Sequence, residues 1–222
     1  MSPRIHFIGT VHGDPLGAQR LEKALECEIP TILTLECSRE LINYIENEGI
    51  PAMHRRIESL DLSDEEAECL KNDFGKIEYE IEITRQYAFR HNVPLHYIDH
   101  PSVVKSPKRK VSQFMKLSAD DLRTFLNPSS CRGTNRIYLS YQKLFSSFDG
   151  SEQQEADLNA HHFGLCDAYM AQKLEKILES GARVVHVGGI GHCLQDAQGR
   201  TLFSKLRKYN PTRETLKWYD EI

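Results

Sequence analysis

The stretch Ala182–Cys193 reads Ala-Arg-Val-Val-His-Val-Gly-Gly-Ile-Gly-His-Cys. Its β-branched residues suit a buried strand, and the glycines that follow let the backbone turn sharply. The sequence therefore predicts a strand that ends in a glycine bend, with His192 at the C-terminal edge. The N-terminal stretch Ile5–His12 repeats this arrangement, so that its Gly-x-x-His segment aligns with the later one. These two bends, far apart in the chain, are the starting point for predicting both the fold and the site.

Strand and helix patterns alternate along the 222-residue chain. The apolar runs that predict buried strands are 4–9, 31–36, 94–99 and 182–189. Helical spacing of apolar residues predicts helices at 15–28, 38–48, 75–92, 136–147, 152–180 and 199–209. Strands that alternate with helices predict an α/β fold with a largely parallel central sheet flanked by helices. We expect one domain, with helical insertions or a lid at 51–74 and 105–150 and an edge strand at 215–219.

Composition and charge argue against several classes of protein. The chain has 40% hydrophobic and 27% charged residues, a formal charge of -4 and a pI near 6.2, which give no general attraction to nucleic acid or to an anionic membrane. No apolar run approaches the roughly 20 residues of a membrane span, and the N-terminus does not resemble a secretory signal. Six scattered cysteines without a Cys-x-x-Cys pair favour reduced thiols. We therefore expect a cytoplasmic protein with no nucleic-acid or membrane partner, and a homodimer is left open.

Ionisable residues follow the predicted strands. His12 and His192 close the two glycine bends. Glu36 ends the second predicted strand, and Asp99 ends the third, directly before His100. Because parallel strands point their C-terminal ends in one direction, we expect these side chains along one rim of the sheet, where open α/β sheets bind their ligands.

Two histidines and one glutamate on separate strand ends are a common ligand set for a catalytic metal. We therefore predict a divalent cation, Mn, Co, Fe or Zn, held by His12, Glu36 and His192. Such a cation lowers the pKa of bound water to roughly 7 and polarises a carbonyl oxygen, which suits hydrolysis of an amide or ester. Asp99 or Asp167 could orient a ligand histidine or serve as general base. The alternative is that both histidines are only turn residues.

Other polar residues carry weaker signals. Cys37 and Cys193 each follow a proposed ligand and could act as a nucleophile or a soft ligand, although buried inert thiols are commoner. The basic cluster at 105–110 is interpreted as a solvated loop, with a phosphate or localisation patch as the alternative. The histidines inside predicted strands, which are interpreted as hydrogen-bonded core residues, are His6, His96 and His186.

Five segments resemble successive motifs of the TraB family of pheromone-shutdown proteins, which is related to the Tiki proteases. These segments are Gly9–His12, Leu35–Arg39, Ile98–Asp99, Asp167–Ala171 and Val187–His192. They occur in the order that the family has, over residues 5–195. The resemblance implies an α/β fold shared with erythromycin esterase and with the haem-binding ChaN proteins.

The resemblance also implies roles for single residues. His12 and His192 match the histidines proposed to bind metal in Tiki-like proteases, and Glu36 matches the acidic residue after the second strand. Two positions depart from the family: Asp99-His100 stands where Asp-Arg is usual, and Cys166-Asp167 stands where Arg-Asp is usual. An arginine at either position could hold a substrate carboxylate or an oxyanion, so the departures bear on substrate choice. The residues assigned to substrate binding or to support of the ligands are Gly9, Arg39, His100 and Gly189.

Three functions follow from these observations. The first is a metal-dependent hydrolase that acts on a peptide, another amide or a small molecule. The second is a metal-free hydrolase in which His12 is a general base paired with Glu36. The third is a non-catalytic protein that binds haem or a peptide at the same rim. Resistance of turnover to a chelator would favour the second, and a haem absorbance without turnover would favour the third.

Overall fold

The computed structural model describes residues 5–74, 78–126, 165–196 and 198–220, and it divides the chain into two units. The first unit contains Met1–Glu36, Tyr79–His100 and Arg132–Ile222, and the second contains Cys37–Glu78 and Pro101–Cys131. The second unit thus includes the segment 51–74 and the described part of the segment 105–150. The predicted helix at 136–147 and the first part of the one at 152–180 lie outside the described residues.

The first unit is built on a five-stranded sheet in which every pairing is parallel. Its strands, in spatial order, are β3 (Leu95–Tyr97), β2 (Ile32–Leu35), β4 (Val184–Gly189), β1 (Ile5–Thr10) and β5 (Thr212–Thr215). Non-consecutive neighbours such as β1 and β4 require crossover connections, which helices supply. The prediction of an α/β fold with a largely parallel sheet is therefore confirmed, and the strands predicted at 4–9, 31–36, 94–99 and 182–189 are β1, β2, β3 and β4.

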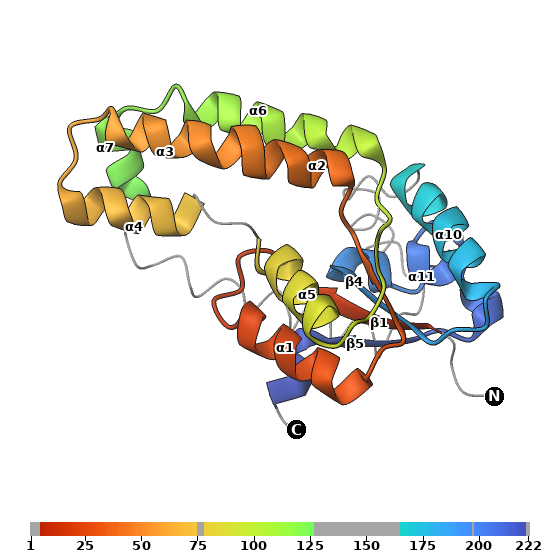
Figure 1. Ribbon diagram of the computed structural model, residues 1–222. Coiled ribbons are helices and arrows are strands. Elements are labelled where there is room, and N and C mark those ends of the chain that lie inside the picture. Colours follow the sequence, from red (N-terminus) through yellow and green to blue (C-terminus); the bar gives the residue numbers. More distant parts are fainter. Residues whose placement is uncertain (1–4, 75–77, 127–164, 197, 221–222) are drawn as a thin grey trace. The chain divides into compact units, whose positions relative to one another are not determined.

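Apolar side chains on the central strands join the sheet to its helices. Ile5 and Phe7 of β1 and Val184 of β4 pack with residues of α10 (Leu165–Leu178) and α11 (Leu202–Lys205). His6 alternates with these residues and so points to the opposite face, where its ring contacts Tyr219 of the 3-10 turn η7 (Leu216–Asp220). The helices α1 (Gly17–Glu28) and α5 (Tyr79–Arg90) lie side by side, as Figure 1 shows. The described residues of this unit also form two short 3-10 turns, η5 (Ile190–Cys193) and η6 (Arg207–Tyr209).

A buried arginine joins the loop after β1 to the end of the described chain. The Arg20 guanidinium on α1 donates to Asp14 Oδ2 at 2.8 Å and to both carboxylate oxygens of Asp220, at 2.7 and 2.6 Å. Asp14 in turn lies two residues beyond His12, and its backbone N–H donates to the carbonyl of Val11. Charge-assisted bonds of this kind are stronger than neutral ones, so Arg20 ties the loop after β1 to the distant turn η7.

The second unit is helical in its described residues. A nearly continuous helix consists of α2 (Arg39–Tyr44), the π-helical turn η1 (Ile45–Gly49) and α3 (Ile50–Glu58). The other elements are α4 (Asp64–Phe74), η2 (Pro101–Val104), α6 (Lys105–Phe114), α7 (Ala119–Arg123) and η3 (Thr124–Leu126). The core of this unit is formed by Ile57, Leu70, Phe114 and Leu122. Across the described residues of both units, no helix is long and apolar enough to cross a membrane.

Three predictions of local structure are wrong. The edge strand expected at 215–219 is a 3-10 turn instead, and the strand β5 ends at Thr215, where its pairing with β1 ends. The basic cluster 105–110 lies in the first turns of α6 rather than in a loop. His96 is exposed on the edge strand β3, whereas His6 and His186 are buried as predicted. In each case the neighbours of the segment in space, which a local pattern does not contain, decide its structure.

Candidate functional site

The rim of the sheet brings two predicted bends to adjacent strands. We call Gly9–His12 the His12 bend and Gly189–His192 the His192 bend. They follow β1 and β4, which are neighbours, and β4 also pairs with β2, whose end carries Glu36. The strands pair Gly9 with Gly188 rather than with Gly189, so the two bends are offset by one residue along the strands. The three predicted ligands therefore come from consecutive strands, with His192 on the middle one.

His192 lies between two carboxylates. Its Nε2 is 2.9 Å from Glu36 Oε1, and its Nδ1 is 2.9 Å from Asp167 Oδ1. The side chain of Asp167, on α10, is only 1% exposed, and the same oxygen accepts the backbone N–H of Leu202 at 2.6 Å. Asp167 therefore fixes the orientation of the ring, which is one of the two roles considered for it from the sequence, and directs Nε2 toward Glu36.

The charges of His192 and Glu36 stabilise each other and shift both pKa values. Burial alone would lower the pKa of His192, but Glu36 and Asp167 outweigh burial and raise it well above the ordinary value. Burial would likewise raise the pKa of Glu36, but the charge and hydrogen bond of His192 and the N–H of Gly189 lower it to about 2. Without a metal ion, the group is an imidazolium held between two carboxylates.

Two glycines at the end of β4 position the Glu36 carboxylate. The backbone N–H of Gly189 donates to Glu36 Oε2 at 2.6 Å. A Cβ atom added to Gly188 would lie 2.7 Å from Glu36 Oε2 and 2.7 Å from His186 Nε2, closer than real Cβ atoms come to their neighbours. At Gly189 the nearest such contact is 3.4 Å, again to Glu36 Oε2. Only a residue without a side chain therefore fits at Gly188 behind the carboxylate.

His186 lies behind Glu36 as a buried neutral ring. Its Nδ1 is hydrogen-bonded to Thr34 Oγ1 at 3.0 Å, while its Nε2 has no hydrogen-bond partner among the described residues. Burial outweighs the attraction of Glu36 and lowers the pKa of His186 to about 4. Because the His186 ring is neutral, it does not neutralise the negative charge of Glu36, which is compensated by His192.

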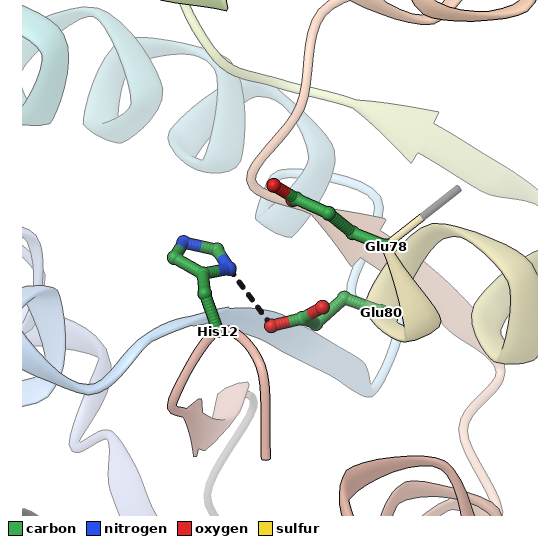
Figure 2. Close-up of side chains that lie close together, drawn as sticks. All are labelled: His12, Glu78 and Glu80. Carbon is green, nitrogen blue, oxygen red and sulfur yellow. Dashed lines mark hydrogen bonds and ion pairs between the residues drawn. The ribbon is translucent and has the colours of Figure 1, made fainter. Parts of the chain in front are cut away.

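His12 has a different partner. Its Nδ1 is 2.9 Å from Glu80 Oε1 of α5, as Figure 2 shows. The Glu80 side chain is 5% exposed and that of His12 is 63% exposed, so a buried carboxylate orients a largely exposed ring. The second oxygen of Glu80 is buried and lacks a hydrogen-bond partner within the described residues. Figure 2 also draws Glu78, which ends the first of the two segments of the second unit, whereas His12 and Glu80 both belong to the first unit.

The structure does not bring all three predicted metal ligands into one group. Within the described ranges, the ligand atoms of His12, Glu36 and His192 do not all lie within 4.8 Å of one another. Glu36 and His192 are in contact, and His12 contacts Glu80 instead. The two histidines nevertheless share one feature: each places Nδ1 on a buried carboxylate from a helix. Histidines that bind metal through Nε2 are usually held in this way.

The remaining predicted residues, Asp99, His100 and Arg39, lie in different surroundings. Asp99 is buried, and its Oδ1 accepts the backbone N–H of His100 at 2.6 Å. Burial and the charge of Glu36 raise the pKa of Asp99 to about 6, a value that suits proton transfer near neutral pH. The His100 ring meets the edge of Tyr169 at 4.8 Å between centroids. Arg39 is exposed at the start of α2 in the second unit.

The thiols beside the site are poor candidates for chemistry. Cys37 and Cys193 are buried free thiols. Burial and the nearby charge of Glu36 raise the pKa of Cys193 far above its ordinary value, so its reactive thiolate form is suppressed. Burial also raises the pKa of the half-buried Cys166. These features favour the interpretation of the two thiols next to the ligands as inert.

Two residues with clear roles at the rim do not stand out in the sequence. Glu80 lies one residue before Ile81 and four before Thr84, both of which the helical pattern directs inward. A carboxylate on such an apolar face is a signal for a hydrogen-bonding partner, and that partner is His12. Gly188 looks like one more turn glycine, and nothing in the local sequence shows that Glu36 fills the space behind it.

No protein-family model, no curated protein and no solved structure matches the chain.

Proposed function

We propose that the chain is a cytoplasmic, metal-dependent hydrolase of peptide or other amide bonds, of the TraB and Tiki kind and with the fold of erythromycin esterase and ChaN. The observation that carries the proposal is the shared arrangement of the two rim histidines, each with Nδ1 on a buried carboxylate. This arrangement fixes the tautomer that leaves Nε2 for a cation. The free cysteines of the described chain are compatible with a reducing compartment.

The residues that would hold the cation are Glu36 and His192, with His12 as the third donor. Glu36 Oε1 and His192 Nε2 already face one another at 2.9 Å, so a cation would replace the proton that His192 now holds between them. The largely exposed ring of His12 is less constrained by packing than that of His192. Mn, Co, Fe or Zn would supply an activated water and a Lewis acid for the substrate carbonyl.

The residues of the chain divide the remaining work. Asp167 holds the ring of His192, and Glu80 holds the ring of His12. Asp99, with its raised pKa and its place near Glu36, is the candidate to take up a proton during hydrolysis and to return it to the leaving amine. Gly188 keeps Glu36 from being displaced. His100 and the start of the His12 bend remain candidates for contact with the substrate.

A second candidate function is favoured by the contact between His12 and Glu80. An exposed imidazole oriented by a buried carboxylate is the usual form of a general base. His12 would then take a proton from the water that attacks the substrate carbonyl. The partner of His12 in this alternative is Glu80, in place of the Glu36 expected from the sequence. Hydrolysis that continues in excess chelator would select this alternative.

A metal titration tests the main proposal. We expect the purified chain to bind one equivalent of Zn²⁺ or Mn²⁺ by calorimetry and elemental analysis, and His192→Ala and Glu36→Gln to weaken binding at least tenfold. His91→Ala is a matched control, because His91 also pairs with a glutamate, Glu26, at 3.1 Å but away from the rim. Absence of binding in the parent chain, or equal loss in the control, would overturn the proposal.

Activity is measured separately on a peptide and amide library, with and without chelator. The metal-dependent proposal requires turnover that chelator abolishes and that one equivalent of added metal restores. A parent chain that binds metal but turns over no peptide, amide or ester would leave the cation site standing and refute the hydrolase. Circular dichroism of each variant shows whether a loss of activity comes from unfolding.

A further inference from the structure

The second unit contains an apolar groove that the proposed hydrolase does not use. Its walls are the helix from α2 to α3 on one side and α6 on the other, and its volume is about 460 Å³. This size lies within the range of small-molecule sites. All of its lining residues belong to the second unit. The apolar side chains that dominate the lining are Ile45, Ile50, Met53, Val111, Phe114 and Leu117.

An irregular turn of helix forms part of this wall. Ile45–Gly49 is one turn of π-helix between two α-helical segments, and both of its end residues line the groove. Gly49 is buried there, and a Cβ atom on it would lie 3.4 Å from the Tyr44 ring, which lines the groove as well. A π-helical turn inside a regular helix is often found at a functional site.

The opposite wall carries positive charge. The helix α6 has four cationic residues, Lys105, Lys108, Arg109 and Lys110, and no acidic residue over Lys105–Phe114. Lys110 lines the groove, and the Lys108 ammonium lies 5.0 Å from the centre of the Tyr44 ring. One carboxylate, Glu78, also lines the groove. An apolar lining that includes the Lys110 side chain, with Lys108 beside Tyr44, favours a ligand that has an apolar body and an anionic end.

We propose that this groove binds a small monoanionic amphiphile, a straight-chain carboxylate, with its carboxylate at Lys110 and its hydrocarbon chain against Met53 and Phe114. The volume favours a small molecule over a docked helix, whose diameter with side chains is about 10 Å. A straight hydrocarbon chain matches the mostly aliphatic lining, and a single negative charge matches Lys110. The groove belongs to the second unit and the rim residues to the first, and the proposal is independent of the hydrolase.

Calorimetry with decanoate and with decanol, on the full chain, tests this inference. We expect decanoate to bind with one-to-one stoichiometry and more tightly than decanol. Lys110→Gln should weaken decanoate about fivefold, as expected for one partly exposed charge contact, and leave decanol unchanged. Lys105→Gln, on the same helix but outside the groove lining, is the matched control and should change neither. Met53→Asp should abolish binding of both probes.

Several results would overturn the inference. Equal affinity for the two probes, with no effect of Lys110→Gln, would mean that the groove does not recognise an anion. Equal weakening by Lys105→Gln would mean that decanoate responds only to the general charge of α6. No binding of either probe, or binding that Met53→Asp leaves intact, would show that this groove is not the site. Thermal melting of each variant confirms that it is folded.

Discussion

The two Gly-x-x-His bends begin from the same short sequence but place their histidines in opposite surroundings. The His192 side chain is 20% exposed and lies between two carboxylates, whereas that of His12 is 63% exposed and has Glu80 beside it. The strands before the bends are neighbours, so the difference does not come from the sheet. It comes from what lies against each bend: Glu36 and α10 against one, α5 against the other. The shared motif places each histidine at the end of a strand, but the residues packed against the bend determine the exposure of the ring and its partners.

The largest expected effect is a difference in the free energy of unfolding between His192→Ala and His12→Ala. His192→Ala leaves the buried carboxylate of Asp167 and the partly buried carboxylate of Glu36 without their cation, so we expect the free energy of unfolding to fall by about 3–5 kcal/mol. His12→Ala removes a largely exposed ring and one hydrogen bond to Glu80, so we expect a fall of about 1–3 kcal/mol. Urea denaturation of both metal-free variants measures the difference. Equal losses would contradict the contrast between the bends.

A smaller effect is expected from two neighbouring glycines at the His192 bend. Gly188→Ala forces a methyl group against Glu36 and His186, and overpacking of this kind costs about 1–3 kcal/mol. Gly189→Ala meets its nearest neighbour at 3.4 Å, so we expect a change of at most about 0.5 kcal/mol. The same denaturation experiment compares them. If Gly189→Ala were the more damaging of the two, Gly188 would not be the residue that positions Glu36.

The smallest effect is the pH dependence of stability in the metal-free protein. The pKa of Glu36 is lowered from 4.5 to about 2, so its stabilising contribution is lost as the pH falls below about 4.5. The pKa of His192 is raised above 6.5, so its contribution is lost as the pH rises above about 6.5 toward the folded value. The pair therefore stabilises most between these limits.

Denaturation midpoints at pH 6 and pH 8 measure the alkaline side of this window. Relative to His192→Ala, the parent chain should lose at most about 1.4 kcal/mol per pH unit, while His12→Ala should follow the parent. A parent chain and a His192→Ala variant with the same pH dependence would show that the imidazolium of His192 does not contribute to stability.

Much of the fold could be predicted from the sequence because its signals are local. Apolar runs mark the buried strands, and parallel strands bring their C-terminal ends to one rim, which predicts His12, Glu36 and His192 along that rim. The order of the strands, which makes β2, β4 and β1 neighbours, is known only from the structure. The error at 215–219 has a physical reason as well. Alternating residues resemble a strand, but Tyr219 is directed by its contacts with His6 and Glu28, which are more than 190 residues away in the chain.

The partners of the site were harder to predict. The sequence predicts Asp167 as one of two residues that orient a ligand histidine, and Asp167 contacts His192. The sequence does not predict the role of Glu80, because that role depends on α5 packing beside the loop after β1, and a helical pattern does not tell which loop a helix face meets. The groove of the second unit depends on the pairing of two helices and on a π-helical turn, and neither has a signature in the local sequence.

The Arg20 cluster has a consequence for how the end of the chain communicates with the rim. Its guanidinium is shared between Asp220 and Asp14, and Asp14 belongs to the same loop as His12. If η7 unfolded or were removed, Arg20 would lose one of its two counter-charges, Asp220. Only Asp14, in the loop that holds His12, would then compensate the buried guanidinium. An extension that displaces Asp220 is therefore expected to disturb the loop of Asp14 and His12 through Arg20, without contacting that loop.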